Sequence, residues 1–345
     1  MSHRLEVLKA LLLNTNVNSI FTIISKYDFY LEGIVVDNLG INYDKIMSIE
    51  LLPSGKKLLV RTINMDFYIW NMENREFIKI PIDFGGRSTE FYIIPFGDDN
   101  FLTNFNEQII IWDTEGKIVG KLEDDSVIWT VEIMGSKIIT KNKNEVISIW
   151  DIETRKKEKV IDESNSRLGL EVLSDNLIIS QSSNTLNVWD INSSKILKSY
   201  DFGDRYISTF KVLSPNIIIV VLAGKILLLW NIDTNTVKEI SSNKHVFNTL
   251  KISNNEFLVI HDDEIRVYNT QGTFKKNITY KDSVYYVNAL PSGELALMKA
   301  NDLSLWDLDD INMRFFKDGS YTQVLYIPFI KKTLAVKLGK LEFME

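Results

Sequence analysis

The chain has 345 residues, of which 45% are hydrophobic and 25% are charged, a composition typical of a globular protein with a sizeable core. Its formal net charge of −7 argues against a general nucleic-acid-binding or anionic-membrane-binding surface. The absence of cysteine excludes disulfides, thiolate nucleophiles and cysteine-based zinc sites, and it fits a reducing compartment. No run approaches the roughly 20 apolar residues of a membrane-spanning helix. We therefore expect an intracellular protein, most simply cytoplasmic, with nuclear or particle-associated locations left open.

The first segment, residues 1–29, differs from the rest of the chain. Its apolar residues lie at helical spacing on both sides of an asparagine-rich break at 14–19: Leu5, Leu8, Leu12, Ile20, Ile23, Ile24 and Tyr27. This pattern predicts two short helices. Two interpretations stay open for them, a lid packed against the remaining protein or a small docking element for a second protein.

From residue 30 to residue 345, short strand-like runs separated by Gly, Pro, Asn and Asp turns recur with a period near 40 residues. Residues 146–151 (VISIWD) illustrate the run that ends on an aromatic residue. The equivalent positions along the chain are Trp70, Trp112, Trp150, Trp189, Trp230, Tyr268, Trp306 and Met344. Four such runs per period predict a β-propeller. Because each aromatic residue ends a buried strand, we interpret this set as core rather than as a ligand site.

The C-terminal runs determine the expected number of blades. Residues 341–345 (LEFME) align with 303–307 (LSLWD), and no outer-strand run follows them. The unassigned outer-strand candidate is 33–40 (GIVVDNLG) near the N-terminus. Pairing this strand with the last blade would close the ring and remove a bare sheet edge. We therefore predict an all-β, eight-bladed propeller; the alternative, seven blades, would leave residues 319–345 as a surplus piece.

Trp-Asp or Trp-Asn closes six of these repeats, and LPSG segments at 52–55 and 290–293 precede second strands. In these motifs residues 30–345 resemble a divergent WD40-repeat protein. The resemblance implies a non-catalytic scaffold that binds protein or peptide partners on the top face of the propeller. WD40 repeats usually carry a Gly-His pair before the inner strand, whose His joins a hydrogen-bond network with Ser or Thr and the Trp, yet none of the three histidines here follows a glycine. We therefore expect the blades to rely on apolar packing.

The short N-terminal segment followed by LPSG-type repeats is also similar to BTB- or F-box-linked WD-repeat proteins. That similarity implies that residues 1–28 dock an adaptor, and that the propeller is a substrate receptor of a ubiquitin-ligase-like assembly.

Candidate partner-binding residues lie outside the repeat positions. Trp129 begins the inner-strand run 127–133, and Tyr285 and Met47 occupy the matching places in 284–290 and 45–51. The resemblance implies that such positions face the rim of the central channel, where aromatic anchors dominate binding energy. Arg87 and Arg205 lie in neighbouring loops and would steer a partner. The alternative is that Trp129 packs under a loop and the charged loops are merely solvated.

Enzymatic interpretations find little support in the sequence. It contains no GxSxG elbow, no Walker-type loop and no HExxH pair. The three histidines are scattered and form no metal-binding cluster. The run His261, Asp262 and Asp263 is typical of a structural turn. We predict no catalytic residues, cofactor or metal. The rival to the scaffold is a structural subunit of a larger complex or viral particle, and the least favoured reading is a propeller-fold hydrolase.

Overall fold

The computed structural model describes residues 46–64, 66–74, 76–81, 93–97, 99–163, 166–240, 244–253, 255–280, 284–290, 293–299, 302–309, 312–328, 332–337 and 340–344. The predicted helices in residues 1–29, the predicted closing strand 33–40 and Arg87 lie outside this description. Within it, all regular structure is β, and no helix that could cross a membrane is found in this part of the chain.

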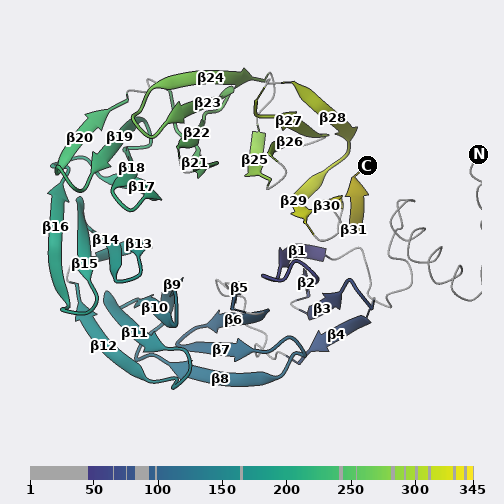
Figure 1. Ribbon diagram of the computed structural model, residues 1–345, viewed down its shortest axis with the longest axis horizontal. Helices are drawn as coiled ribbons and strands as arrows, with labels where there is room; N and C mark the ends of the chain where they lie inside the picture. The colour runs from purple at the N-terminus through teal and green to yellow at the C-terminus, as the bar shows by residue number, and fades with distance from the viewer. Residues whose placement is uncertain are drawn as a thin grey trace, which may run out of the picture.

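The strands form eight antiparallel sheets arranged as the blades of a ring (Figure 1). Blade 1 contains β1 (Ile46–Leu51), β2 (Lys57–Thr62), β3 (Phe67–Asn71) and β4 (Glu76–Ile80). Blade 2 contains β5 (Ile93–Phe96), β6 (Asn100–Phe105), β7 (Gln108–Trp112) and β8 (Ile118–Glu123). Blade 3 contains β9 (Ile128–Met134), β10 (Lys137–Asn142), β11 (Val146–Asp151) and β12 (Lys157–Asp162). Blade 4 contains β13 (Ser166–Ser174), β14 (Leu177–Ser182), β15 (Thr185–Asp190) and β16 (Lys195–Asp201).

The second half of the ring repeats this pattern. Blade 5 contains β17 (Ile207–Ser214), β18 (Ile217–Leu222), β19 (Ile226–Asn231) and β20 (Thr236–Glu239). Blade 6 contains β21 (Asn248–Lys251), β22 (Glu256–Ile260), β23 (Glu264–Asn269) and β24 (Phe274–Thr279). Blade 7 contains β25 (Val284–Ala289), β26 (Glu294–Lys299), β27 (Asp302–Asp307) and β28 (Met313–Asp318). In the described residues, blade 8 contains β29 (Tyr321–Ile327), β30 (Lys332–Lys337) and β31 (Lys340–Met344).

Each blade is a meander in which consecutive strands pair, and its first strand faces the centre of the ring (Figure 1). The second strands are buried along most of their length, as in β18 (IIIVVL), which explains why they read as continuous apolar runs. The outer strands are mostly exposed, as in β16. Glycines at the first turns adopt φ angles of 71° at Gly55 and 89° at Gly293, a left-handed conformation that strains other residues. The LPSG motif is therefore a turn signal.

The ring closes between blade 8 and blade 1, and this confirms the prediction of eight blades over seven. Ile327, Leu334 and Val336 of blade 8 form one hydrophobic cluster with Ile49 and Trp70 of blade 1. The side-chain amide of Gln323 in β29 clasps the backbone of Ile49 in β1: its Nε2 donates to the carbonyl at 2.6 Å and its Oε1 accepts from the N–H at 2.7 Å. These contacts join residues from opposite ends of the described chain.

The repeat aromatic residues lie on the third strand of their blades, and they pack between neighbouring sheets. Fully or almost fully buried side chains belong to Trp70, Trp112, Trp150, Trp189, Trp230 and Tyr268, and that of Trp306 is partly buried. In blade 8 the backbone of Met344 takes the corresponding place and pairs with Thr333. Burying an aromatic side chain of this size removes on the order of 150–250 Å² from water, so these residues stabilise the contacts between blades.

The expectation that the blades rely on apolar packing is wrong for blades 3 and 4. In blade 3, Trp150 Nε1 donates to Thr140 Oγ1 at 3.1 Å, and the Thr140 hydroxyl donates to Asp124 Oδ2 at 3.1 Å. Asn142 Nδ2 donates to the other oxygen of Asp124 at 3.0 Å. Asp124 precedes the inner strand, where the WD40 resemblance places the histidine. A carboxylate thus takes that role as the hydrogen-bond partner of the Thr–Trp pair.

Blade 4 contains the same network built on a glutamate. Trp189 Nε1 donates to Ser180 Oγ at 2.9 Å, and Ser180 Oγ donates to Glu163 Oε1 at 2.5 Å. Lys141 of blade 3 reaches across to this network, with its Nζ 3.3 Å from Glu163 Oε2 and 3.2 Å from the Gln181 carbonyl oxygen. Burial lowers the pKa of Lys141, and the charge of Glu163 opposes that effect. The ion pair is 1% and 3% exposed, so it joins the two blades with its polar atoms satisfied.

Candidate functional site

Large apolar side chains lie at or directly before the starts of several inner strands. Met47 and Phe247 are 49% and 54% exposed, and Trp129, the second residue of β9, is partly buried. Phe247 is a residue that the sequence analysis missed. It lies 21 residues before Tyr268, just as Trp129 lies 21 residues before Trp150, and this equal spacing was the available signal. The backbone of Tyr285 begins β25 in the matching place, and its side chain lies outside the description.

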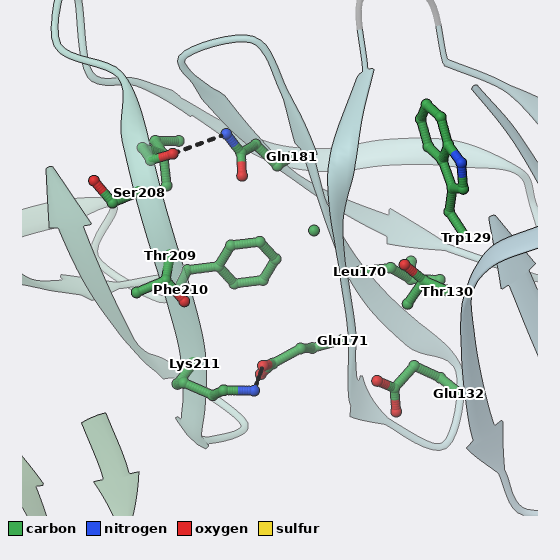
Figure 2. Close-up of a pocket in the computed structure, with 12 residues that line it drawn as sticks. Trp129, Thr130, Glu132, Leu170, Glu171, Gln181, Ser208, Thr209, Phe210 and Lys211 are labelled. Carbon is green, nitrogen blue, oxygen red and sulfur yellow. Dashed lines mark hydrogen bonds and ion pairs between the residues drawn. The ribbon is translucent and has the colours of Figure 1, made fainter. Parts of the chain in front are cut away.

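A cavity of about 650 Å³ opens on the inner strands β9, β13 and β17 of blades 3 to 5 (Figure 2). Its lining residues are Trp129, Thr130, Glu132, Gly169, Leu170, Glu171, Gln181, Ile207, Ser208, Thr209, Phe210 and Lys211. Figure 2 shows Trp129 and Ser208 toward one end and the charged residues toward the other, with the Phe210 ring and Leu170 between them. The cavity therefore combines an aromatic residue toward one end, apolar walls and charged groups toward the other end.

The apolar wall depends on one glycine. A Cβ atom at Gly169 in β13 would lie 2.4 Å from Cε1 of the Phe210 ring, a separation that forces one of them to move. The absence of a side chain at Gly169 thus lets the Phe210 ring approach β13 closely. Gln181 Nε2 donates to the Ile207 carbonyl oxygen at 3.3 Å, which links blade 4 to blade 5.

The charged end contains two glutamates in different situations. Both oxygens of Glu171 are engaged: Oε1 lies 2.6 Å from Lys211 Nζ, and Oε2 accepts from the Val212 N–H at 2.6 Å. Glu132 forms no hydrogen bond or ion pair with any described residue. Burial, with a further contribution from the negative charge of Glu171, raises the pKa of Glu132 to about 7, although Lys211 acts in the opposite direction. Glu132 is therefore a partly buried acid without a compensating partner.

A second cavity, of about 450 Å³, shares Glu132, Glu171 and Lys211 with the first. It is also lined by Pro215 and Lys251, and not by Trp129. The two glutamates therefore lie between two hollows of the channel wall rather than at a closed end.

The other predicted partner-binding residues lie elsewhere. Arg205 is exposed in the turn between β16 and β17, beside Tyr206, which is 50% exposed. The Sδ atom of Met47 accepts a hydrogen bond from Arg61 Nη2 at 2.9 Å. Of the described predicted residues, Trp129 lines the cavity, whereas Met47 and Arg205 do not.

His261 has a structural environment. Its side chain is 1% exposed, its Nδ1 lies 2.9 Å from the His245 carbonyl oxygen, and burial lowers its pKa. Asp263 forms an ion pair with Lys244 at 2.7 Å. Within the described ranges, no group of three His, Asp or Glu side chains could hold a metal ion.

Comparison with known proteins identifies the fold and no closer relationship. No family model matches the sequence, and no curated protein matches it significantly. Among solved structures, the C-terminal WD40 domain of Sif2 superposes with a TM-score of 0.67 at 11% identity, over 87% of this chain and 95% of that domain. The computationally designed protein Ika8 superposes with a TM-score of 0.69 at 15% identity, over 88% of this chain and 97% of the design. Together with the eight sheets, these similarities show that the chain has the fold of an eight-bladed, WD40-type β-propeller.

Proposed function

We propose that this protein is a non-catalytic interaction platform of the cell interior that binds a protein or peptide segment at the channel rim. The observation that carries the proposal is the cavity of about 650 Å³ lined by Trp129, together with exposed apolar side chains at the starts of other inner strands, Phe247 and Met47. Concave sites with apolar walls and a few polar groups are the usual form of ligand sites. Aromatic side chains at such sites contribute a large share of binding energy.

The test compares partners captured by the full chain with those captured by a Trp129→Ala/Phe247→Ala variant. A matched control replaces two exposed apolar residues of the outer strands, Phe274→Ala/Met313→Ala. We expect partners to be lost with the rim variant and kept with the control, as measured by affinity purification with quantitative mass spectrometry. An identical set of partners from all three proteins would contradict binding at the rim.

A more specific proposal is that the platform is the substrate receptor of a ubiquitin-ligase-like assembly, with residues 1–28 docking the adaptor. Its support is the sequence similarity described above. A chain that begins at Tyr30 tests it: ligase components should disappear from the captured set, while partners bound at the rim remain. Capture of the same components without residues 1–28 would contradict this role.

The second candidate, a structural subunit of a larger complex or particle, has one observation in its favour. The outer strands expose a set of large apolar side chains, between 47% and 53% accessible: Ile118, Val160, Ile196, Leu197, Phe274, Met313 and Phe316. They are distributed over five blades, and single exposed apolar residues are common on monomeric proteins. If they form an assembly surface, a Val160→Ser/Leu197→Ser variant should sediment as a smaller species than the unmodified chain.

A hydrolase would need carboxylates that converge on the channel, and Glu132 and Glu171 do approach each other there. Glu171, however, is engaged by Lys211 and by the Val212 amide. In the described residues, no group of three His, Asp or Glu side chains that could hold a metal ion is found.

A further inference from the structure

We propose that the cavity between blades 3 and 5 receives the cationic side chain of a Lys or Arg residue of the partner, with Glu132 as its counter-ion. The inference rests on the proposed function and names the chemistry that the site would select.

The first argument is charge. Glu132 lies on the wall of the cavity and has no hydrogen-bond or ionic partner in the described part of the chain. Its neighbour Glu171 already has both oxygens engaged, so Glu132 is the carboxylate that remains open to a ligand. A cation would supply the compensating charge through charge-assisted hydrogen bonds, which are roughly twice as strong as neutral ones.

The second argument is shape. The Phe210 ring and Leu170 lie between Trp129 and the charged end (Figure 2). Lys and Arg side chains bury an apolar stem while their charged end reaches a polar group, and an aromatic face also attracts a cation. The order of aromatic residue, apolar wall and carboxylate along the cavity therefore matches a long basic side chain.

The third argument is linkage between proton and ligand. The charged groups that face Glu132 are Glu171 from β13 and Lys211 from β17, and Lys251 of β21 lines the adjoining cavity. A ligand that requires ionised Glu132 competes with protonation of that carboxyl group, whose pKa is about 7. Its affinity should rise about tenfold between pH 6 and pH 8 and should be nearly constant above pH 8.

The test uses a phage-displayed library of random dodecapeptides selected on the full chain, on a Glu132→Gln variant and on a Glu153→Gln variant. Glu153 is exposed in the turn between β11 and β12, so its substitution makes the same change in net charge away from the channel. We expect one fixed position to be enriched in Lys or Arg on the full chain and on Glu153→Gln, and to lose that enrichment on Glu132→Gln. A selected peptide should then lose at least tenfold in affinity when norleucine replaces its basic residue.

The outcomes separate this inference from the proposed function. Selected peptides that depend on Trp129 but have no fixed basic position would overturn the inference and leave the platform intact. The same holds if Glu132→Gln retains the basic preference, or if basic residues are enriched evenly along the peptides, as non-specific attraction to a chain of net charge −7 would produce. Failure to select any peptide on any of the three proteins contradicts both proposals. Melting temperatures of the variants verify that each is folded.

Discussion

At the scale of single residues, buried polar groups are the distinctive feature of this propeller. Asp124 is 8% exposed and Glu163 is 4% exposed, yet both accept hydrogen bonds from the Trp–Thr or Trp–Ser pair of a neighbouring strand. In each case the donor is the hydroxyl of Thr140 or Ser180, which itself accepts a hydrogen bond from the repeat Trp. A buried carboxylate is costly unless its lone pairs are satisfied. These networks therefore hold the loop before the inner strand in one position.

Replacement of Asp124 by Asn should lower the free energy of unfolding by about 1–3 kcal/mol, because the amide N–H group cannot accept the hydrogen bonds that one carboxylate oxygen receives. The matched control is Asp125→Asn, since the Asp125 side chain is 89% exposed and its substitution should stay within about 0.5 kcal/mol. Urea titration of both variants measures the difference. Equal losses of stability would show that the network of Asp124 does not stabilise blade 3.

Glu132 should make stability depend on pH. Its folded-state pKa of about 7 lies above the ordinary value of 4.5, so between these values the folded protein retains a proton that the unfolded chain releases. Stability from this group is therefore complete below pH 4.5 and is lost as pH rises toward 7. Glu132→Gln should raise the melting temperature at pH 8 more than at pH 5.

The Glu153→Gln variant again serves as the control, because it should change the melting temperature little at either pH. A Glu132→Gln variant with the same shift in melting temperature at pH 5 and at pH 8 would contradict the raised pKa.

At the scale of elements, inner strands supply both the candidate site and the contacts that hold neighbouring blades together. Strands β9, β13 and β17 line one cavity, and β29 clasps β1 through Gln323. Because side chains alternate along a strand, one inner strand supplies residues for the channel wall and for the contact between blades.

Gln323→Met should lower the free energy of unfolding by about 1–3 kcal/mol, because it leaves the Ile49 N–H and carbonyl without their partner. Gln271→Met is the control, since Gln271 is exposed in the turn between β23 and β24. Thermal unfolding of the two variants provides the comparison. Equal melting temperatures would mean that the two hydrogen bonds of Gln323 to the Ile49 backbone do not contribute to stability.

At the scale of the whole molecule, closure of the ring makes the last blade indispensable. Without residues 319–345, blade 1 would expose the apolar side chains that now pack against Ile327, Leu334 and Val336. We expect the shortened chain to lose its cooperative calorimetric transition and to aggregate, because an apolar face of this kind promotes association. A monomer that unfolds in a sharp transition near the original temperature would mean that seven blades suffice.

The sequence by itself determined the architecture, because its signals are local and repeated. Strand length, turn residues such as Gly55, and a strand end every 40 residues or so that is Trp in six of eight repeats are properties of short segments, and the eight copies reinforce one another. Counting the runs after Trp306 was therefore enough to predict eight blades. The same regularity predicted that Trp129 begins an inner strand, where the structure has it in β9, and equal spacing would also have identified Phe247.

Only the tertiary structure decided which polar residues act together. Folding brings Asp124 next to Thr140 and Glu163 next to Ser180. These acids therefore accept the hydrogen bonds that the histidine would accept in the usual WD40 network. The cavity likewise needs Glu132, Gly169 and Phe210 from three different blades. Neither arrangement has a sequence signature, because both depend on how neighbouring sheets pack side by side rather than on the pattern within any one strand.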